Sequence, residues 1–399
     1  MIEISNKKDC CGCTACAAIC PKDAIVMKED NEGFLYPVIE KDTCINCGAC
    51  ERVCPITHTA KEVSFEQAAY VVQNKDQKVL RESTAGGAFT GIAKYVLHNN
   101  GVVFGVELGD DLTARHIVVK VEDDLYRFRN SKYVQSSVGN TYREVKTFLE
   151  QSRLVCFSGT PCQIEGLKNF LKKEYDNLIT VDVVCRAVPS PLIFRKYVEY
   201  QKKTLEDSIK TVRFRDKHYG YKYSTMNIIT EKNDGNYHQG VESDPWLRAF
   251  FSNICDRPSC YECHFRKQYR VSDFTIWDCF NVGRFSKKLD NDKGATRVLI
   301  HTEKGRKIFD TIKDDFSYVQ LSPEVAVTGV KEMKESVDPN AKREIFFKDA
   351  NRMSGEELFN KYFANSIKVR AEHCVRLICY KLGIYSVAKK LYVKVTHKY

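Results

Sequence analysis

The strongest constraint on this chain is a cysteine pattern that occurs twice in its first sixty residues. Each copy reads C-x2-C-x2-C-x3-C-P, and the two copies occupy residues 10–21 and 44–55. In such a run three closely spaced thiolates bind one iron-sulfur cube, whereas the fourth, carried away by a short helical turn, reaches the other cube. The repeat therefore predicts a small 4Fe-4S domain with two clusters, of the bacterial ferredoxin type, at residues 1–60.

This crossed arrangement gives each cluster four thiols. Cluster one takes Cys10, Cys13, Cys16 and Cys54, and cluster two takes Cys44, Cys47, Cys50 and Cys20. Gly12 and Gly48 suit positions where the backbone approaches a cluster closely. Cys11 is interpreted as a thiol that is not a ligand, with its substitution for Cys10 as the alternative. Short strands are expected at residues 24–27 and 36–39.

Two other uses of cysteine fit this pattern less well. The chain has 18 cysteines among 399 residues, but disulfide scaffolds are short and rich in loops, whereas many segments here have helix or strand periodicity. Structural zinc takes four ligands and does not require runs of four cysteines that end in proline. We therefore expect metal-bound thiolates in a reduced cytoplasm, in a chain that begins Met1-Ile2-Glu3-Ile4 without a signal peptide.

Charge and hydropathy argue against two classes of protein. The net charge of +10 is modest, and acidic residues are interspersed nearly everywhere, unlike a nucleic-acid groove. No run of about 18 uninterrupted apolar residues predicts a membrane-spanning helix. The basic helical tail expected at residues 351–399 either packs on the body with a solvated face or makes peripheral contact with a membrane. Its basic residues are Lys368, Arg370, Arg376, Lys381, Lys389, Lys390, Lys394 and Lys398.

After a polar connector at residues 56–64, strands and helices are expected to alternate. Runs of β-branched residues predict strands at 67–73, 101–108, 115–121, 153–158 and 178–185. Apolar spacing near 3.6 predicts helices at 87–98, 139–151, 161–173 and 191–203. We therefore expect an α+β chain, in which the ferredoxin domain is followed by a larger α/β sheet domain at residues 65–350.

Two junctions between a strand and a helix carry candidate chemistry. Thr160 suits a helix N-cap and Pro161 the first helical position, so Cys162 falls in the first turn. Free backbone N–H groups and the helix dipole stabilise a thiolate or a phosphate there. The small residues at 83–89 suit either a cofactor pyrophosphate or a simple tight turn, and the sequence leaves both interpretations open.

A further group of cysteines lies in the larger domain. Cys185 ends a predicted strand, and Cys260 and Cys263 form a C-x2-C pair after Cys255. Together with Cys162, these thiols are candidates for a third cubane cluster. Three other cysteines are predicted to lie in the core, namely Cys156, Cys374 and Cys379.

Six stretches of the larger domain follow one another in order. They are STAGGAF at 83–89, SKYVQSS at 131–137, GTPCQIEGLKNFL at 159–171, VVCRAVPSP at 183–191, CDRPSCYECHF at 255–265 and SDFTIWDCFNVG at 272–283. With the cysteine repeat, they resemble the coenzyme F420 hydrogenase/dehydrogenase beta-subunit family, in its bacterial branch with a fused ferredoxin domain. The resemblance implies an iron-sulfur flavoprotein oxidoreductase that carries FAD in its larger domain. Electrons would pass between the clusters and a small organic two-electron substrate, with a deazaflavin as one candidate, and a redox partner protein or low-potential donor would exchange electrons with the clusters.

The resemblance also implies site residues. The family's cluster ligands fall on Cys162, Cys185, Cys260 and Cys263, which leaves Cys255 as a neighbour. A lysine near a flavin stabilises its anionic reduced ring, which draws attention to Lys132. No catalytic residue is assigned. The flavin candidates are Ser83, Gly86, Gly87, Ser131, Lys132, Tyr133, Gly159 and Thr160.

The sequence departs from the family at two positions where many members carry glycine. Arg186 follows Cys185, and Trp277 precedes Asp278. Bulky side chains here narrow or reshape the substrate face, which bears on whether the deazaflavin itself binds. The alternative function is therefore a flavin-free electron carrier, or a redox adaptor subunit that docks to a separate catalytic partner.

Overall fold

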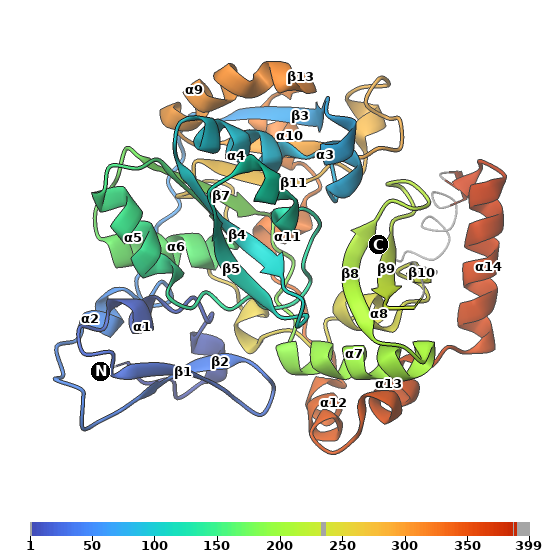
Figure 1. The fold of residues 1–399 in the computed structure, drawn as a ribbon, viewed down its shortest axis with the longest axis horizontal. Helices are drawn as coiled ribbons and strands as arrows, with labels where there is room; N and C mark the ends of the chain where they lie inside the picture. Colours follow the sequence, from blue (N-terminus) through green and yellow to red (C-terminus); the bar gives the residue numbers. More distant parts are fainter. Residues whose placement is uncertain (1, 233–236, 386, 389–399) are drawn as a thin grey trace.

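The first sixty residues fold into a distinct unit, drawn in blue at the lower left of Figure 1. The computed structural model describes residues 2–232, 237–385 and 387–388. A two-stranded antiparallel sheet of β1 (Ile25–Glu29) and β2 (Leu35–Ile39) accompanies two short helices, α1 (Ala15–Ile19) and α2 (Ala49–Arg52). Each helix begins two residues after the second cysteine of a run, so the sequence repeat is also a structural repeat. The two predicted strands are confirmed.

The body is built on an eight-stranded mixed sheet with the strand order β13-β3-β12-β11-β7-β6-β4-β5. The strands β4, β6, β7 and β11 pair in parallel, whereas β5, β12, β3 and β13 join by antiparallel pairing. Parallel neighbours bring their carboxyl ends to one edge of a sheet, which is where such sheets bind ligands. The strands are β3 (Ala68–Asn74), β4 (Val102–Leu108), β5 (Ala114–Val119), β6 (Val155–Gly159), β7 (Leu178–Val183), β11 (Phe274–Asp278), β12 (Thr296–Ile300) and β13 (Phe316–Leu321).

Helices cover both faces of the large sheet. On one face, α4 (Ala88–His98) and α9 (Glu303–Ile312) bury their apolar sides in a core of aliphatic and phenylalanine side chains. On the other face, α5 (Thr141–Glu150) and α6 (Pro161–Leu171) form a second core layer. This second layer also contains Cys13 of the ferredoxin unit. The ferredoxin unit is therefore held to the body by a shared core.

A smaller three-stranded sheet, ordered β10-β9-β8, forms a second lobe with helices from the later part of the chain, on the right of Figure 1. Trp246, Phe194 and Phe359 pack in its core, which also receives Phe34 of the ferredoxin unit. The strands are β8 (Ile209–Asp216), β9 (Thr225–Thr230) and β10 (Tyr237–Gln239). The helices are α7 (Pro191–Leu205), α8 (Pro245–Phe251), α12 (Arg343–Ala350), α13 (Gly355–Phe363) and α14 (Ile367–Lys381).

The expected fold class is confirmed, as a mixed α/β body with an N-terminal ferredoxin-type unit and C-terminal helices. The strands and helices predicted between residues 65 and 205 all form, with ends close to those predicted. The three-stranded sheet of the second lobe was not predicted. Three short helices complete the body: α3 (Gln77–Glu82), α10 (Pro323–Val327) and α11 (Lys331–Lys334).

The C-terminal tail packs on the second lobe through α14. His373 and Arg376 both lie beside the buried carboxylate of Glu242, at 2.8 and 3.7 Å. Within the part of the chain that the structure describes, no helix is long and apolar enough to cross a membrane. The prediction that Cys374 and Cys379 lie in the core is wrong, because α14 has no fully buried residue; Cys374 is exposed and Cys379 is half-buried. Four basic residues of the tail lie outside the described residues: Lys389, Lys390, Lys394 and Lys398.

Candidate functional site

The four thiols predicted for cluster one lie in a buried part of the ferredoxin unit. Cys10, Cys13, Cys16 and Cys54 are each at most 9% exposed. The Cys16 thiol is close enough to those of Cys10 and Cys54 to interact with them electrostatically. Burial, reinforced by these neighbours, raises the pKa of Cys16 to about 12. Thiols so placed stay protonated unless a metal replaces their protons.

The thiols predicted for cluster two line a partly open hollow. Its volume is about 370 Å³, including space open to solvent, and Ile25 and Ile39 also line it. The fold therefore brings a cysteine of the first run beside cysteines of the second. Among them Cys47 is exposed, so this group lies nearer to solvent than the first. The four thiols are those of Cys20, Cys44, Cys47 and Cys50.

Four thiols of the body form a third group. Cys162 lies in the first turn of α6, Cys185 follows β7, and Cys260 and Cys263 bracket a short turn. Burial raises the pKa of Cys185 to about 12, and its thiol interacts with those of Cys162 and Cys263. The Cys260 thiol in turn interacts with those of Cys185 and Cys263. Cys255 lies apart from this group, fully buried in the core of the second lobe.

The donor sets of all three groups consist of sulfur alone. All 18 cysteines are free thiols. Among the described residues, no group of three or more His, Cys, Asp or Glu side chains is placed to hold a single metal ion. A cubane binds its thiolates on separate irons, so it takes more widely spaced groups of thiols. The residues present therefore fit iron-sulfur clusters.

A short segment after α10 covers the third group. The guanidinium of Arg266 donates to the backbone carbonyls of Cys185 and Glu332, which ties the end of β7 to α11. The backbone N–H of Cys263 donates to Ser336 Oγ at 2.9 Å. Since a nearby cation favours the ionised form of a thiol, Arg266 opposes the rise in pKa that burial imposes on both cysteines.

Cys11 lies between the first and third groups. Its thiol interacts with those of Cys13 and Cys162, one from each group. Helix α6, which carries Cys162, also faces the ferredoxin unit across Gly166. A Cβ at this glycine would lie 2.9 Å from Cys13 Sγ. The two groups of thiols are therefore close neighbours across the boundary between the unit and the body.

The SKYVQSS segment links the flavin candidates. At its start, the backbone N–H of Ser131 donates to Thr84 Oγ1 at 2.8 Å. Further along, Ser136 Oγ accepts a hydrogen bond from Gln163 Nε2 at 3.2 Å. Gln163 Oε1 in turn accepts from the backbone N–H of Thr160, which caps α6 as predicted. The glycine turn and the start of α6 are thus joined through one loop.

The glycine turn has a structural explanation of its own. A Cβ at Gly86 would overlap backbone atoms of Val72 and Thr296, and the N–H of Gly86 donates to Thr296 Oγ1 at 2.8 Å. Gly87 adopts a φ of 75° just before α4, a conformation that favours glycine. These observations favour the interpretation of the junction as a tight turn.

Lys132 is half-buried, and its ammonium group contacts the backbone. Nζ donates to the carbonyl oxygens of Arg127 and Arg129 at 3.0 and 2.9 Å. Burial, assisted by the nearby cation of Arg213, lowers the pKa of Lys132 to about 7. Tyr133 stacks on an aromatic ring of α8. The amine of Lys132 therefore already forms hydrogen bonds with the backbone in this structure.

Two further cations of the β8 region lie near Asp278. Arg215 is buried and donates to the hydroxyl of Tyr133 at 3.1 Å and to Asp278 at 3.2 Å. Lys217 donates to three backbone carbonyls, and burial lowers its pKa to about 7. The sequence analysis did not single out these residues, whose signal is an alternation of basic residues along a strand. Clustered cations of this kind suit an anionic group such as a diphosphate.

The two bulky departures from the family pattern both face α11. Arg186 pairs with Glu332 at 3.3 Å and donates to Asn253 Oδ1 at 3.0 Å. Trp277 packs in a small core that includes Met333. Both side chains are therefore fixed by contacts within the chain.

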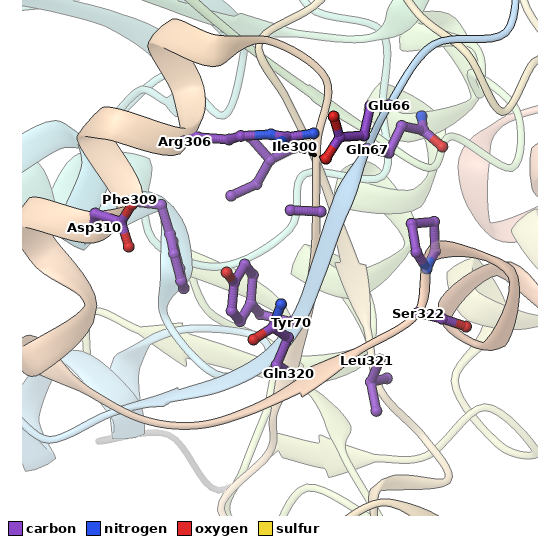
Figure 2. Close-up of a pocket in the computed structure, with 12 residues that line it drawn as sticks. Glu66, Gln67, Tyr70, Ile300, Arg306, Phe309, Asp310, Gln320, Leu321 and Ser322 are labelled. Atoms are coloured by element: carbon purple, nitrogen blue, oxygen red, sulfur yellow. Dashed lines mark hydrogen bonds and ion pairs between the residues drawn. The ribbon is translucent and has the colours of Figure 1, made fainter.

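A separate hollow lies between α9, β3 and β13, as Figure 2 shows. Its volume is about 730 Å³, including space open to solvent, and Tyr70, Phe309 and Arg306 are among its lining residues. Arg306 pairs there with Glu66 at 2.8 Å. None of the cysteines or flavin candidates lines it, so this hollow is distinct from the predicted site.

Arg257 is a site residue that the sequence analysis missed. Its side chain is fully buried, and its Nε donates to the backbone carbonyl of Cys10 at 2.8 Å. It precedes the turn Pro258–Cys260, which leads to the third group. A single arginine has no periodic signal, and only its place in the CDRPSC stretch could have drawn attention to it.

Comparisons with known proteins agree with this organisation. The family described as the C terminus of the "Coenzyme F420 hydrogenase/dehydrogenase, beta subunit" matches residues 152–325, and the family described as "4Fe-4S dicluster domain" matches residues 9–57. The first match contains the whole third group of thiols. The glycine turn and Lys132 lie outside it. No curated protein matches the chain.

The solved structures give a weaker likeness. A chain of the xenon-derivatized F420-reducing NiFe hydrogenase complex from Methanosarcina barkeri is 16% identical, with a TM-score of 0.43, over 76% of this chain and 91% of that chain. A likeness of this degree carries no argument about function. On the evidence of the two family matches and of the cysteine groups, the chain contains a C-terminal domain of the coenzyme F420 hydrogenase/dehydrogenase beta-subunit family at residues 152–325 and a 4Fe-4S dicluster domain at residues 9–57.

Proposed function

We propose that the chain is an iron-sulfur flavoprotein oxidoreductase, which passes electrons between ferredoxin-type 4Fe-4S clusters and a small organic two-electron substrate. Clusters supply one-electron carriers, and a flavin supplies the conversion between one-electron and two-electron chemistry. The proposal keeps the domain division at residues 1–60, 65–350 and 351–399. Its metal ligands are Cys10, Cys13, Cys16 and Cys54 for cluster one, Cys20, Cys44, Cys47 and Cys50 for cluster two, and Cys162, Cys185, Cys260 and Cys263 for a third cluster.

The observation that carries the proposal is the contact between the first and third groups of thiols. Cys13 and Cys162 come from different domains, and the Cys11 thiol interacts with both. A structural metal site needs no such neighbour, whereas electron transfer requires carriers close together. The exposed Cys47 marks the side at which a redox partner or donor protein would dock.

The residues of the body hold the proposed sites. Arg266 and Ser336 fix the backbone beside the third group. Arg215 provides positive charge for an anionic cofactor or for a reduced flavin ring, and Lys217, whose pKa is lowered to about 7, adds to it when protonated. The flavin contacts proposed are Ser83, Gly86, Gly87, Ser131, Lys132, Tyr133, Gly159 and Thr160.

One set of observations favours the alternative of a flavin-free electron carrier or adaptor subunit. Gly86 is explained by close packing on the sheet, and Lys132 is already bonded to two carbonyls. Two of the flavin candidates therefore have structural roles that need no cofactor. In this alternative, a separate catalytic partner would bind the organic substrate, whether a deazaflavin or another molecule.

Iron, sulfide and flavin counts of anaerobically purified protein distinguish these functions. The oxidoreductase carries about twelve irons, four for each cubane, and releases a flavin on denaturation. The double variant Cys260→Ser with Cys263→Ser is expected to lose about four irons and keep the N-terminal clusters. Cys255→Ser is the matched control, because this buried cysteine lies outside the third group, and its iron content should not change.

Two other results of these counts would contradict the proposal. An unchanged iron content in the double variant would show that these cysteines hold no third cluster. Protein with about eight irons and no flavin would establish the carrier function instead.

A further inference from the structure

Arg257 is a buried cation without a carboxylate partner among the described residues. Its side chain is fully buried, and its guanidinium donates to Gln135 Oε1 at 3.1 Å and to the backbone carbonyls of Cys10 and Leu35 at 2.8 and 3.0 Å. By comparison, Arg270 is equally buried but forms an ion pair with a buried aspartate at 3.0 Å. Burying a charge with no counter-charge is strongly unfavourable, so the surroundings of Arg257 must supply one.

Aromatic rings shield this cation from water. The guanidinium lies 4.3 Å from the centroid of Tyr36 and 5.4 Å from that of Phe34. Such contacts attract a cation weakly, but they carry no net negative charge. The rings therefore keep the site dry, which strengthens whatever electrostatic interaction the guanidinium makes there.

The partners that remain are cysteine thiols, which become anionic thiolates when they bind iron. Nη2 of Arg257 lies 3.5 Å from Cys10 Sγ, within hydrogen-bonding range of sulfur. The guanidinium also interacts electrostatically with the thiols of Cys11 and Cys260. Arg257 thus faces the first group of thiols directly and is also near the third.

The cysteine loop is shaped to admit this guanidinium. Gly12 has a φ of 72°, and a Cβ there would lie 2.9 Å from Nη1 of Arg257. Any other residue at this position would be strained and would also push the arginine away. The predicted role of Gly12, close approach of the backbone, therefore includes room for Arg257.

The second group of thiols has a different environment. Two arginines lie beside it, and both are open to solvent or paired: Arg52 Nη1 donates to the backbone carbonyl of Cys47 at 3.0 Å in an exposed position, and Arg143, which donates to the carbonyl of Cys20 at 3.1 Å, forms an ion pair with Asp23. Solvent screens a charge in such a place. The two clusters therefore differ in the charge that surrounds them, although their cysteine runs are alike.

We propose that Arg257 is the counter-charge of cluster one, and that its hydrogen bond to Cys10 raises the reduction potential of cluster one above that of cluster two. The inference rests on the proposed function, because it requires clusters at both groups. One-electron reduction adds one negative charge to a cluster, with no bond made or broken, and a fixed cation stabilises that charge. An electron that arrives at the solvent side is then drawn inward, toward the third group.

Redox titration followed by electron paramagnetic resonance tests this role. In Arg257→Gln, which removes the charge, the potential of cluster one should fall by at least about 59 mV, a tenfold change in the one-electron equilibrium constant. The reduction potential of cluster two should not change. Arg343→Gln is the matched control, because Arg343 also joins the ferredoxin unit to the body, through Glu32 at 2.6 Å, but faces none of the proposed ligands.

Each result of the redox titration either supports the proposed role of Arg257 or overturns it. Arg257→Gln with a full iron content and an unchanged potential of cluster one would overturn the proposal, as would an equal shift in Arg343→Gln. The iron count of the unaltered protein tests the proposed function separately.

If Arg257→Gln does not take up iron, the wild-type contact can be measured instead. Pulsed electron paramagnetic resonance of reduced protein labelled with 15N-arginine should detect a guanidinium nitrogen coupled to cluster one. This signal should persist in Arg52→Lys, which removes the arginine beside Cys47. Absence of the coupling would overturn the proposal.

Discussion

Replacing Gly166 by alanine tests how the ferredoxin unit is fitted to the body. A Cβ at this position, within α6, would lie 2.9 Å from Cys13 Sγ, 3.0 Å from Cys13 Cβ and 3.3 Å from the hydroxyl oxygen of Tyr142. Tyr142 is fully buried, and its hydroxyl donates to the Gln163 carbonyl at 2.7 Å, so it cannot retreat. The added methyl group must therefore displace Cys13, a proposed ligand of cluster one.

Two opposing effects set the change in the free energy of unfolding. Alanine in place of glycine inside a helix stabilises by about 1 kcal/mol. An extra carbon forced into a packed core costs about 1–3 kcal/mol. We expect a net loss of roughly 1 kcal/mol. The larger effect is local, because movement of the Cys13 thiol weakens iron binding in the ferredoxin unit.

Urea denaturation and iron counts of anaerobically purified protein measure these two effects. Gly91→Ala is the control, because its Cβ would overlap the Phe316 ring in the core beneath α4, far from any proposed ligand. The control should lose stability but keep its iron, whereas Gly166→Ala should lose part of the iron of cluster one. Gly166→Ala with full iron and at least wild-type stability would refute the packing of α6 against the cysteine loop.

Two further predictions concern buried charges. The pKa of Lys132 is about 7 in the folded chain and about 10.5 when the side chain is exposed. Between these two pH values the unfolded chain therefore binds this proton more tightly than the folded chain does. The free energy of unfolding should consequently rise as the pH increases from 7 toward 10. Urea denaturation at pH 7 and 9 should show a smaller rise in Lys132→Met than in the wild type, and equal rises would contradict the burial of the amine. Arg270→Met leaves the buried carboxylate of Asp182 unpaired, at a cost of about 3–5 kcal/mol. The double variant with Asp182→Asn should recover part of that loss, and a double variant that is less stable than Arg270→Met would count against the ion pair.

The elements that sequence reasoning predicted correctly are those with a local signal. The cysteine runs specify the ferredoxin unit because ligand spacing is itself the structural constraint. Strands such as β4 and β7, buried on both faces, appear as mainly apolar runs, interrupted by Glu107 in β4 and by Thr180 and Asp182 in β7. The β8–β9 pair has no such signal, because its register shifts between Ile209 and Thr211 and again between Arg213 and Asp216. Basic residues along β8 further hide its alternation.

Prediction from the sequence was limited in the same way for individual side chains. Lys132 was expected beside a flavin because it lies in a characteristic stretch, but sequence could not show that its amine meets the carbonyls of Arg127 and Arg129. Cys374 was expected in the core because cysteine is usually buried, yet α14 contacts the lobe along one side only. In both cases the environment of the side chain depends on residues that are distant in the sequence.

The two cysteine runs are identical in spacing, so the sequence of the ferredoxin unit alone makes its clusters equivalent. The fold removes this equivalence, because the buried guanidinium of Arg257 approaches Cys10 of the first run. Arg257 and Gly166 meet the first run at Cys10 and Cys13, while Cys47 of the second run faces solvent. With the proposed role of Arg257, one repeated motif would hold an inner and an outer carrier, and the difference between them would depend on contacts with the body. It follows that Arg257→Gln in the full chain should reduce the difference in potential between the two clusters, since this change removes the buried charge that contacts Cys10.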